Sequence, residues 1–196
     1  SEFGGTLFAI AKDVKSQLEF NPARVAGYRL IGYENRLLAR EDFDDDAKDA
    51  GELGAGHRVT ALYEVVPAGQ PLPLAKGAGP LRYQTVQPSA AAKSSELCTL
   101  KLRYKQPKPK ATSTLLETIV QDAPQTSMSE NMQLASATAS FGMLLRGSQY
   151  KGTATYGSAL ALARQSAKHD PSGYRAELCQ LIEKARFLTD PLQAGK

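Results

Sequence analysis

Tryptophan is absent from this sequence of 196 residues, and cysteine and histidine occur only twice each. Two cysteines are too few for a disulfide framework, so a packed apolar core has to hold the fold together. The favoured interpretation of Cys98 and Cys179 is two separately buried thiols, and one bridge between them is the alternative. No apolar run reaches the roughly 18 residues that a membrane-spanning helix needs, so we expect no such helix in this segment.

Familiar catalytic motifs are missing as well. His57 stands in a turn setting after a glycine, and His169 lies in a joint between two predicted helices. Neither histidine lies in a pattern that would place a nucleophile beside it. The sequence has no GxSxG elbow, P-loop, HExxH or CxxC motif. We therefore expect a protein that is not an enzyme, and an unrecognised hydrolase is the catalytic alternative.

Residues 1–12 are expected to be a cloning remnant followed by a junction to an upstream domain. They open with Ser-Glu-Phe, and Leu7, Ile10 and Ala11 are then spaced for one face of a helix. The predicted helix end runs into the first predicted strand with almost no linker. Such a short junction predicts a permanent contact between the two domains.

Residues 13–122 alternate apolar and polar residues in short runs, which is typical of half-buried strands. Several short strands at this spacing favour an antiparallel, sandwich-like arrangement over a parallel sheet with crossover helices. Two long connections, at 40–57 and 67–80, interrupt the pattern. The expected strands are 13–20, 25–34, 57–67, the run ELCTLKLRYK at 96–105 and 113–121, with a short one at 81–86.

From residue 123 to 196 the apolar period changes from two to about 3.6, which predicts three helices packed on the strands. The predicted fold class is therefore α+β, with a sandwich-like antiparallel part first and a three-helix part last. The apolar stripes expected to face the core are Leu134, Ala137, Phe141, Leu144 and Leu145 on the first helix, Tyr156, Ala159, Leu160 and Ala163 on the second, and Tyr174, Leu178, Leu181, Ile182, Ala185 and Leu188 on the third.

Capping residues predict the starts of the first and third helices. Ser127 and Glu130 have capping-box spacing before the first helix, and the second helix is expected at about 155–168. The third helix has Asp170 as its expected cap and Pro171 at its first position.

The net charge is +4, and the charged residues are unevenly distributed along the sequence. The basic cluster within and after the run at 96–105 would suit nucleic acid, but the strict alternation of that run favours the wet face of a strand. We expect a solvated sheet face, at an edge that lysines protect, and no nucleic-acid partner. The cluster consists of Lys101, Arg103, Lys105, Lys108 and Lys110.

The most charged segment, residues 41–52, holds seven acidic residues and one lysine. Its first aspartates match the spacing of an EF-hand loop, but Ala47 stands where that loop needs glycine and Leu53 where it needs a bidentate acid. The segment is expected to be solvated or to cap basic groups such as Arg36 and Arg40. The alternative is a calcium site, whose candidate ligands are Asp42, Asp44, Asp45, Asp46, Asp49 and Glu52.

A family resemblance runs through the segment from VKSQLEF to LYEV, residues 14–65, and resumes in LCTLKLRYK and FGMLLRGSQYKGTATY. The sequence resembles the C-terminal domain, of unknown function, of bacterial von Willebrand factor type A proteins. In those proteins the domain directly follows the type A domain. The resemblance covers most of residues 4–188.

This resemblance implies an upstream α/β adhesion domain with a metal site, in an envelope, periplasmic or secreted protein. The Asp-x-Ser-x-Ser motif of that metal site does not occur here, so no metal-binding residue is carried over. The implied function is a non-catalytic interaction or scaffolding domain. Its implied partners are the adjoining type A domain and an unidentified protein ligand, and a calcium-binding regulatory module is the alternative.

Overall fold

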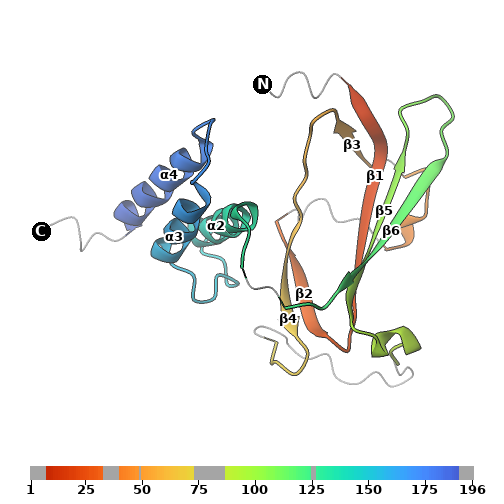
Figure 1. Cartoon of the computed structure of the whole chain (residues 1–196), viewed down its shortest axis with the longest axis horizontal. Coiled ribbons are helices and arrows are strands. Elements are labelled where there is room, and N and C mark those ends of the chain that lie inside the picture. Colours follow the sequence, from red (N-terminus) through yellow and green to blue (C-terminus); the bar gives the residue numbers. More distant parts are fainter. Residues whose placement is uncertain (1–7, 33–39, 49, 73–86, 125–126, 190–196) are drawn as a thin grey trace, which may run out of the picture. The chain divides into compact units, whose positions relative to one another are not determined.

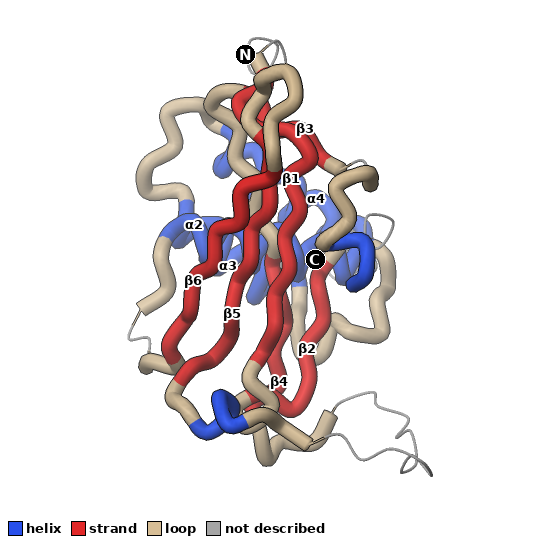
Figure 2. The backbone as a smooth tube through the Cα atoms, turned by 90° about the vertical axis from the view of Figure 1, so that its right-hand side faces the viewer, coloured by secondary structure: helices blue, strands red, loops and turns tan. Residues whose placement is uncertain are grey.

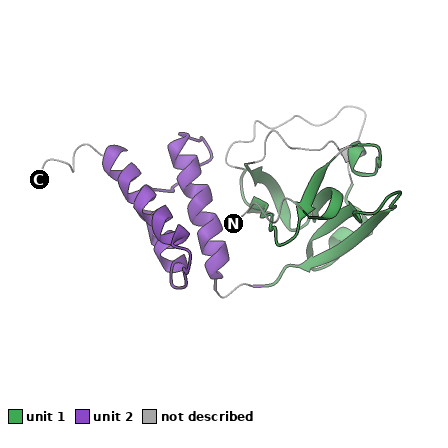
Figure 3. Ribbon diagram, turned by 90° about the horizontal axis from the view of Figure 1, so that it is seen from above, with its two compact units in different colours: residues 1–123 green, residues 124–196 purple. Residues whose placement is uncertain are grey.

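The computed structural model describes residues 8–32, 40–48, 50–72, 87–124 and 127–189. The chain divides into two units, residues 1–123 and 124–196, which Figure 3 colours separately. The first unit contains antiparallel strands and the second contains three α-helices. The predicted α+β fold class is therefore confirmed.

Two antiparallel sheets build the first unit (Figure 1, Figure 2). Four strands form one sheet in the order β3-β1-β5-β6, and β2 and β4 form the other. Two short 3-10 helices, η2 and η3, lie in the connections. The strands are β1 Ala9–Phe20, β2 Val25–Ile31, β3 Gly51–Gly54, β4 Leu62–Pro67, β5 Glu96–Lys105 and β6 Ser113–Gln121; the 3-10 helices are η2 Arg40–Phe43 and η3 Ala90–Lys93.

The start of the chain differs from the prediction. Residues 9–12 belong to β1 and are not the end of a helix, because they pair with two other strands. Ala9 and Ala11 pair with β3, and Lys12 pairs with Lys105 of β5. The strand β3 lies inside the predicted long connection and was not predicted. The expected short strand at 81–86 lies outside the described residues.

The basic strand β5 is an interior strand, so the predicted lysine-protected edge is wrong. It pairs along its length with β1 on one side and β6 on the other. The basic side chains lie on the face opposite Cys98, as predicted, but the burial does not alternate as expected, because Leu100 is 39% exposed and the basic residues are half-buried. An interior position is compatible with Arg103 and Lys105 because carboxylates of Asp44, Asp46 and Asp13 pair with these two cations.

Aromatic side chains join the two sheets at one end of the first unit. The ring of Phe20, the last residue of β1, lies 4.6 Å from that of Tyr28 and 5.9 Å from that of Tyr63, measured between centroids. Tyr28 and Tyr63 come from β2 and β4, which form the second sheet. Tilted and edge-on contacts of this kind add to the apolar area that they bury.

The helices of the second unit are α2 Glu130–Leu145, α3 Tyr156–Ser166 and α4 Tyr174–Thr189. Ser129, and not Ser127, caps α2, because its hydroxyl accepts a hydrogen bond of 3.2 Å from the backbone of Met132. Thr155 and Ser158 form a reciprocal capping box at α3.

Asp170 binds the backbone N–H groups of Arg175 and Ala176 at 3.0 and 2.9 Å, as its predicted capping role requires. The helix nevertheless begins three residues after Pro171, which is a correction to the predicted start. Gly173, with a φ of +76°, turns the chain immediately before α4.

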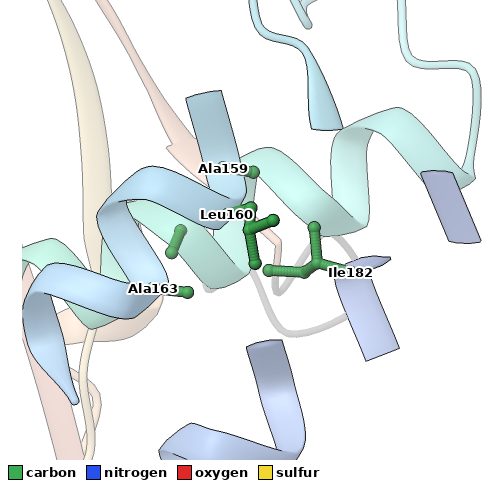
Figure 4. Packing of buried hydrophobic residues seen from close by; sticks show 5 residues of the cluster. Ala159, Leu160, Ala163 and Ile182 are labelled. Carbon is green, nitrogen blue, oxygen red and sulfur yellow. The ribbon is translucent and has the colours of Figure 1, made fainter. Parts of the chain in front are cut away.

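Small residues form the centre of the helical core (Figure 4). Ala137, Ala159 and Ala163 are fully buried, and Leu160 meets the fully buried Ile182 between α3 and α4. The close approach that alanine allows decides which side of each helix faces inward. The predicted stripes are therefore only partly correct, because Leu145, Tyr174, Leu181 and Leu188 are exposed.

Both cysteines are free thiols, in agreement with the favoured interpretation. Burial raises the pKa of each thiol, Cys98 in the first unit and Cys179 in the second. Within the part of the chain that the structure describes, none of the helices combines the length and the apolar character needed to cross a membrane.

Candidate functional site

The acidic segment is seated on the polar face of the four-stranded sheet. We use this name for residues 42–48, which begin with the last two residues of η2. Phe43 is buried and anchors the segment, whereas the residues from Asp44 to Lys48 are exposed. One buried aromatic therefore fixes a run of charged side chains against the sheet.

Lys15 of β1 holds the backbone of the acidic segment. Its side chain is almost completely buried, with the residue only 4% exposed. Its ammonium group donates hydrogen bonds to the backbone carbonyls of Asp42, at 3.1 Å, and Asp45. A buried ammonium group is tolerated only with such partners, because burial removes its hydration.

A β-bulge lies in β1 immediately before Lys15. The pairing register shifts between Ala11 and Val14 on the β3 side and between Lys12 and Lys15 on the β5 side. Asp13, inside the bulge, has a φ of 51°, which is uncommon for a residue other than glycine. Bulges change the direction of the side chains around them, and here the bulge places Asp13 beside β5.

Arg103 of β5 binds two carboxylates of the acidic segment. Its guanidinium group lies 3.1 Å from an oxygen of Asp44 and 3.2 Å from an oxygen of Asp46. The same Asp46 oxygen accepts a hydrogen bond from the hydroxyl of Ser113 on β6. The Ser113 hydrogen bond, followed by that of Arg103, holds the pKa of Asp46 below its ordinary value.

Lys105 joins the bulge to the segment. Its ammonium nitrogen lies 2.8 Å from a carboxylate oxygen of Asp13 and 2.9 Å from the backbone carbonyl of Asp46. The hydrogen bond between Lys105 and Asp13 is the main cause of both shifts: it lowers the pKa of the Asp13 carboxyl and raises that of Lys105. The pair is thus charged across the physiological pH range.

The other candidate calcium ligands have separate partners. The Asp42 carboxylate lies 3.5 Å from Lys48, and Asp45 accepts a 2.9 Å hydrogen bond from the backbone of Ala47. Glu52, on β3, lies 3.6 Å from Lys12. Asp49 and Arg36 lie outside the described residues, as does the side chain of Arg40.

The acidic segment is therefore held by ion pairs with Arg103 of β5 and by hydrogen bonds from Lys15 of β1 and Lys105 of β5 to its backbone carbonyls. Among the described residues, no group of three or more His, Cys, Asp or Glu side chains has a geometry that could hold a metal ion. The predicted capping of basic groups is present, but its cations are Lys15, Arg103 and Lys105. The alternation that places Arg103 and Lys105 on one face of their strand was the signal that could have identified them.

The edge strand β6 is a second candidate site, which the sequence reasoning did not single out. Within the described residues it pairs only with β5. Leu115 and Ile119 lie on one face and Leu116 and Val120 on the other, and all four are 39% to 50% exposed. The doublets LL and IV in STLLETIVQ were the available signal, because neighbouring strand residues point to opposite faces.

Known proteins similar to this chain give this geometry a context. The family model described as uncharacterized protein YfbK, C-terminal, matches residues 5–188. The uncharacterized protein YfbK of Escherichia coli strain K12 is 43% identical over 196 residues, which cover 97% of this chain and 32% of that relative. The chain thus spans about a third of the length of the curated relative that it matches. No solved structure matches it.

Proposed function

We propose that this chain, which belongs to the YfbK C-terminal family, is a non-catalytic interaction module of a larger protein. The observation that carries this proposal is the edge strand β6, which is apolar on both faces. A strand with one wet face alternates apolar and polar residues. A strand with apolar residues on both faces is typical of one that is covered on both sides.

The backbone of β6 supports the same proposal. Edge strands that remain free in solution are commonly protected by lysine, proline, bulges or very short length. β6 is nine residues long, contains neither lysine nor proline, and carries Glu117 as its one charged residue. An open edge of this kind suits strand addition, in which backbone hydrogen bonds give affinity and the side chains give specificity.

We further propose the rest of the same protein as the first partner. The resemblance to the C-terminal domains of von Willebrand factor type A proteins supports an adjoining type A domain. This chain covers 32% of the YfbK relative, so the rest of that protein is long enough to contain such a domain. On this proposal the module positions a ligand-binding domain in the cell envelope, the periplasm or outside the cell. The acidic segment then has a structural role and holds the polar face of the sheet closed.

The test uses this chain and the remainder of its parent protein as two separate polypeptides. Leu116→Lys and Ile119→Lys each place a charge on one face of β6. Val59→Lys is the matched control, because Val59 is even more exposed, at 71%, but lies outside the strands. We expect each β6 variant to weaken binding roughly tenfold or more, and the control to bind as the parent does.

Circular dichroism and a thermal melt on each variant accompany the binding measurement. Two correctly folded β6 variants that bind like the control would refute the role of this strand. Turnover by the isolated chain of any ester, peptide or phosphate substrate, lost in a single-residue variant, would refute the non-catalytic assignment.

A further inference from the structure

An exposed apolar row runs along α4. Tyr174, Leu181 and Leu188 are 50% to 74% exposed and follow one another at intervals of seven residues. Seven residues make about two helical turns, so the three side chains share one face of the helix. We call these three residues the α4 seam. Leu178 and Cys179, which pack against the helical core together with Ile182, are not part of it.

The α4 seam is separate from the packing that holds the helical unit together. The core already contains Ile182 of α4, which is fully buried against α3. Three large apolar residues on one exposed face of α4, one in each heptad where a full coiled coil has two, form a narrow row on which a further helix can pack. The seam thus offers the surface of a two-helix contact.

Two opposite charges flank the seam. Glu177 and Lys184 are exposed and lie before and after Leu181, each displaced to the same side of the seam by the helical repeat of 3.6 residues. In heptad terms both occupy the position next to the apolar row, where charges select the partner and its direction. The seam therefore carries its own specificity pattern.

We propose that the α4 seam binds the α4 seam of a second copy of this chain, with the two helices antiparallel. Centring the pair on Leu181 places Leu181 opposite its counterpart and Tyr174 opposite Leu188 of the other copy. It also brings Glu177 within one residue, about 1.5 Å along the axis, of the position opposite Lys184 of the other copy. The two-fold symmetry produces this favourable pair twice.

The charges favour the antiparallel arrangement. In a parallel pair the two-fold axis runs along the helices, so Glu177 and Lys184 of one copy lie on the opposite side of the contact from those of the other copy, and no Glu177–Lys184 pair forms. The pattern is thus complementary to itself when the helices run in opposite directions, which favours a second copy as the occupant.

The contact is small. A helix of 16 residues is about 24 Å long, and a pair of such helices buries less than the roughly 1,200 Å² of a stable interface. We therefore expect a dimer that dissociates in the micromolar range or above and that needs concentrated protein or a second point of attachment.

Sedimentation velocity of the whole chain over a range of concentrations tests the proposal. Glu177→Lys and Lys184→Glu each create two like-charge contacts in the dimer, and we expect each to raise its dissociation constant roughly tenfold at low salt. An equimolar mixture of the two variants should dimerise again, because both contacts are then attractive. Ala176→Lys, an exposed change about 140° around α4 from the seam, should dimerise like the parent.

The mixture separates this proposal from its competitors. A mixture that stays monomeric, or single variants that dimerise like the parent, would refute it. A parent chain that is monomeric at every concentration would also refute it. A dimer that survives Leu181→Glu but is lost in Leu116→Lys would assign self-association to β6 and overturn the role of α4. Because the β6 binding assay does not involve the α4 seam, failure of one proposal leaves the other to be judged separately.

Discussion

Replacing Lys15 by methionine would test the anchoring of the acidic segment directly. Methionine keeps most of the volume of the buried stem and removes the ammonium group that binds the carbonyls of Asp42 and Asp45. The apolar packing thus changes little, and the main loss is the two charge-assisted hydrogen bonds. The acidic segment would then depend on Phe43 and on the ion pairs of β5.

The magnitude follows from two opposing effects. A hydrogen bond involving a charged group contributes about 1.5–3 kcal/mol, so two of them set an upper limit of about 3–6 kcal/mol. Removing the ammonium group also removes the cost of burying it, and carbonyls near the surface can bind water instead. We therefore expect the free energy of unfolding of the β-rich unit to fall by about 2 kcal/mol.

Hydrogen exchange followed by mass spectrometry resolves the β-rich unit from the helices in the intact chain. We expect Lys15→Met to lower protection in β1 and β5 and to accelerate exchange at residues 42–48 most. Lys12→Met is the control, since Lys12 forms an exposed pair with Glu52 that is worth about 0–1 kcal/mol. Equal effects of the two variants, or no effect of Lys15→Met, would show that the buried ammonium group does not anchor the segment.

Three further predictions follow from the same contacts. Ile182→Ala should destabilise the helical unit by about 2–5 kcal/mol, whereas Leu188→Ala, at an exposed position, should cost less than about 1 kcal/mol in a chemical melt of dilute protein. The pKa values of Asp13 and Asp46 are lowered in the folded state from an ordinary value of 3.8, so their contribution to stability is complete above that pH. It is lost as the pH falls through the folded values, so protection at residues 42–48, corrected for the pH dependence of intrinsic exchange, should fall only below about pH 4. Calorimetry should detect no micromolar calcium binding, because the aspartates already have cationic partners; a one-to-one isotherm that Asp46→Ala abolishes would show the opposite.

The sequence located secondary-structure elements well wherever a regular apolar pattern extended over many residues. The alternation in β5 and the apolar run of β6 located both strands within the predicted ranges, and the second helix was expected from about residue 155, one residue before the observed start of α3. β3, with four residues and a glycine at each end, is too short to show alternation and forms because β1 provides its hydrogen-bonding partner. Residues 9–12 have apolar spacing that fits either a helix or a strand, and pairing decided in favour of the strand.

Long-range partners were the information that local patterns lacked. Asp44 and Arg103 are 59 positions apart in the sequence, so composition could identify the acidic segment but not the cations that bind it. The stripe of α4 was ambiguous for a related reason. Its apolar residues span more than one face, and the alanines of α3 determine that Ile182 is buried while Leu181 is exposed.

The acidic segment covers the polar face of the four-stranded sheet, and β6 leaves one edge of that sheet unpaired within the described residues. These two features determine which partner strand could pair with β6. Register places Leu116 opposite Leu102 and Val120 opposite Cys98 on the apolar face, and Leu115 opposite Arg103 on the face that the acidic segment occupies. A strand added at β6 would continue both faces of the sheet. The added strand would need apolar residues opposite Leu115 on one face and opposite Leu116 and Val120 on the other. A polar side chain at these positions would be buried without a partner. The partner strand should therefore carry apolar doublets like those of β6, and a strand with simple alternation should bind more weakly in a peptide competition assay. Equal competition by the two kinds of peptide would mean that backbone pairing alone determines binding at this edge.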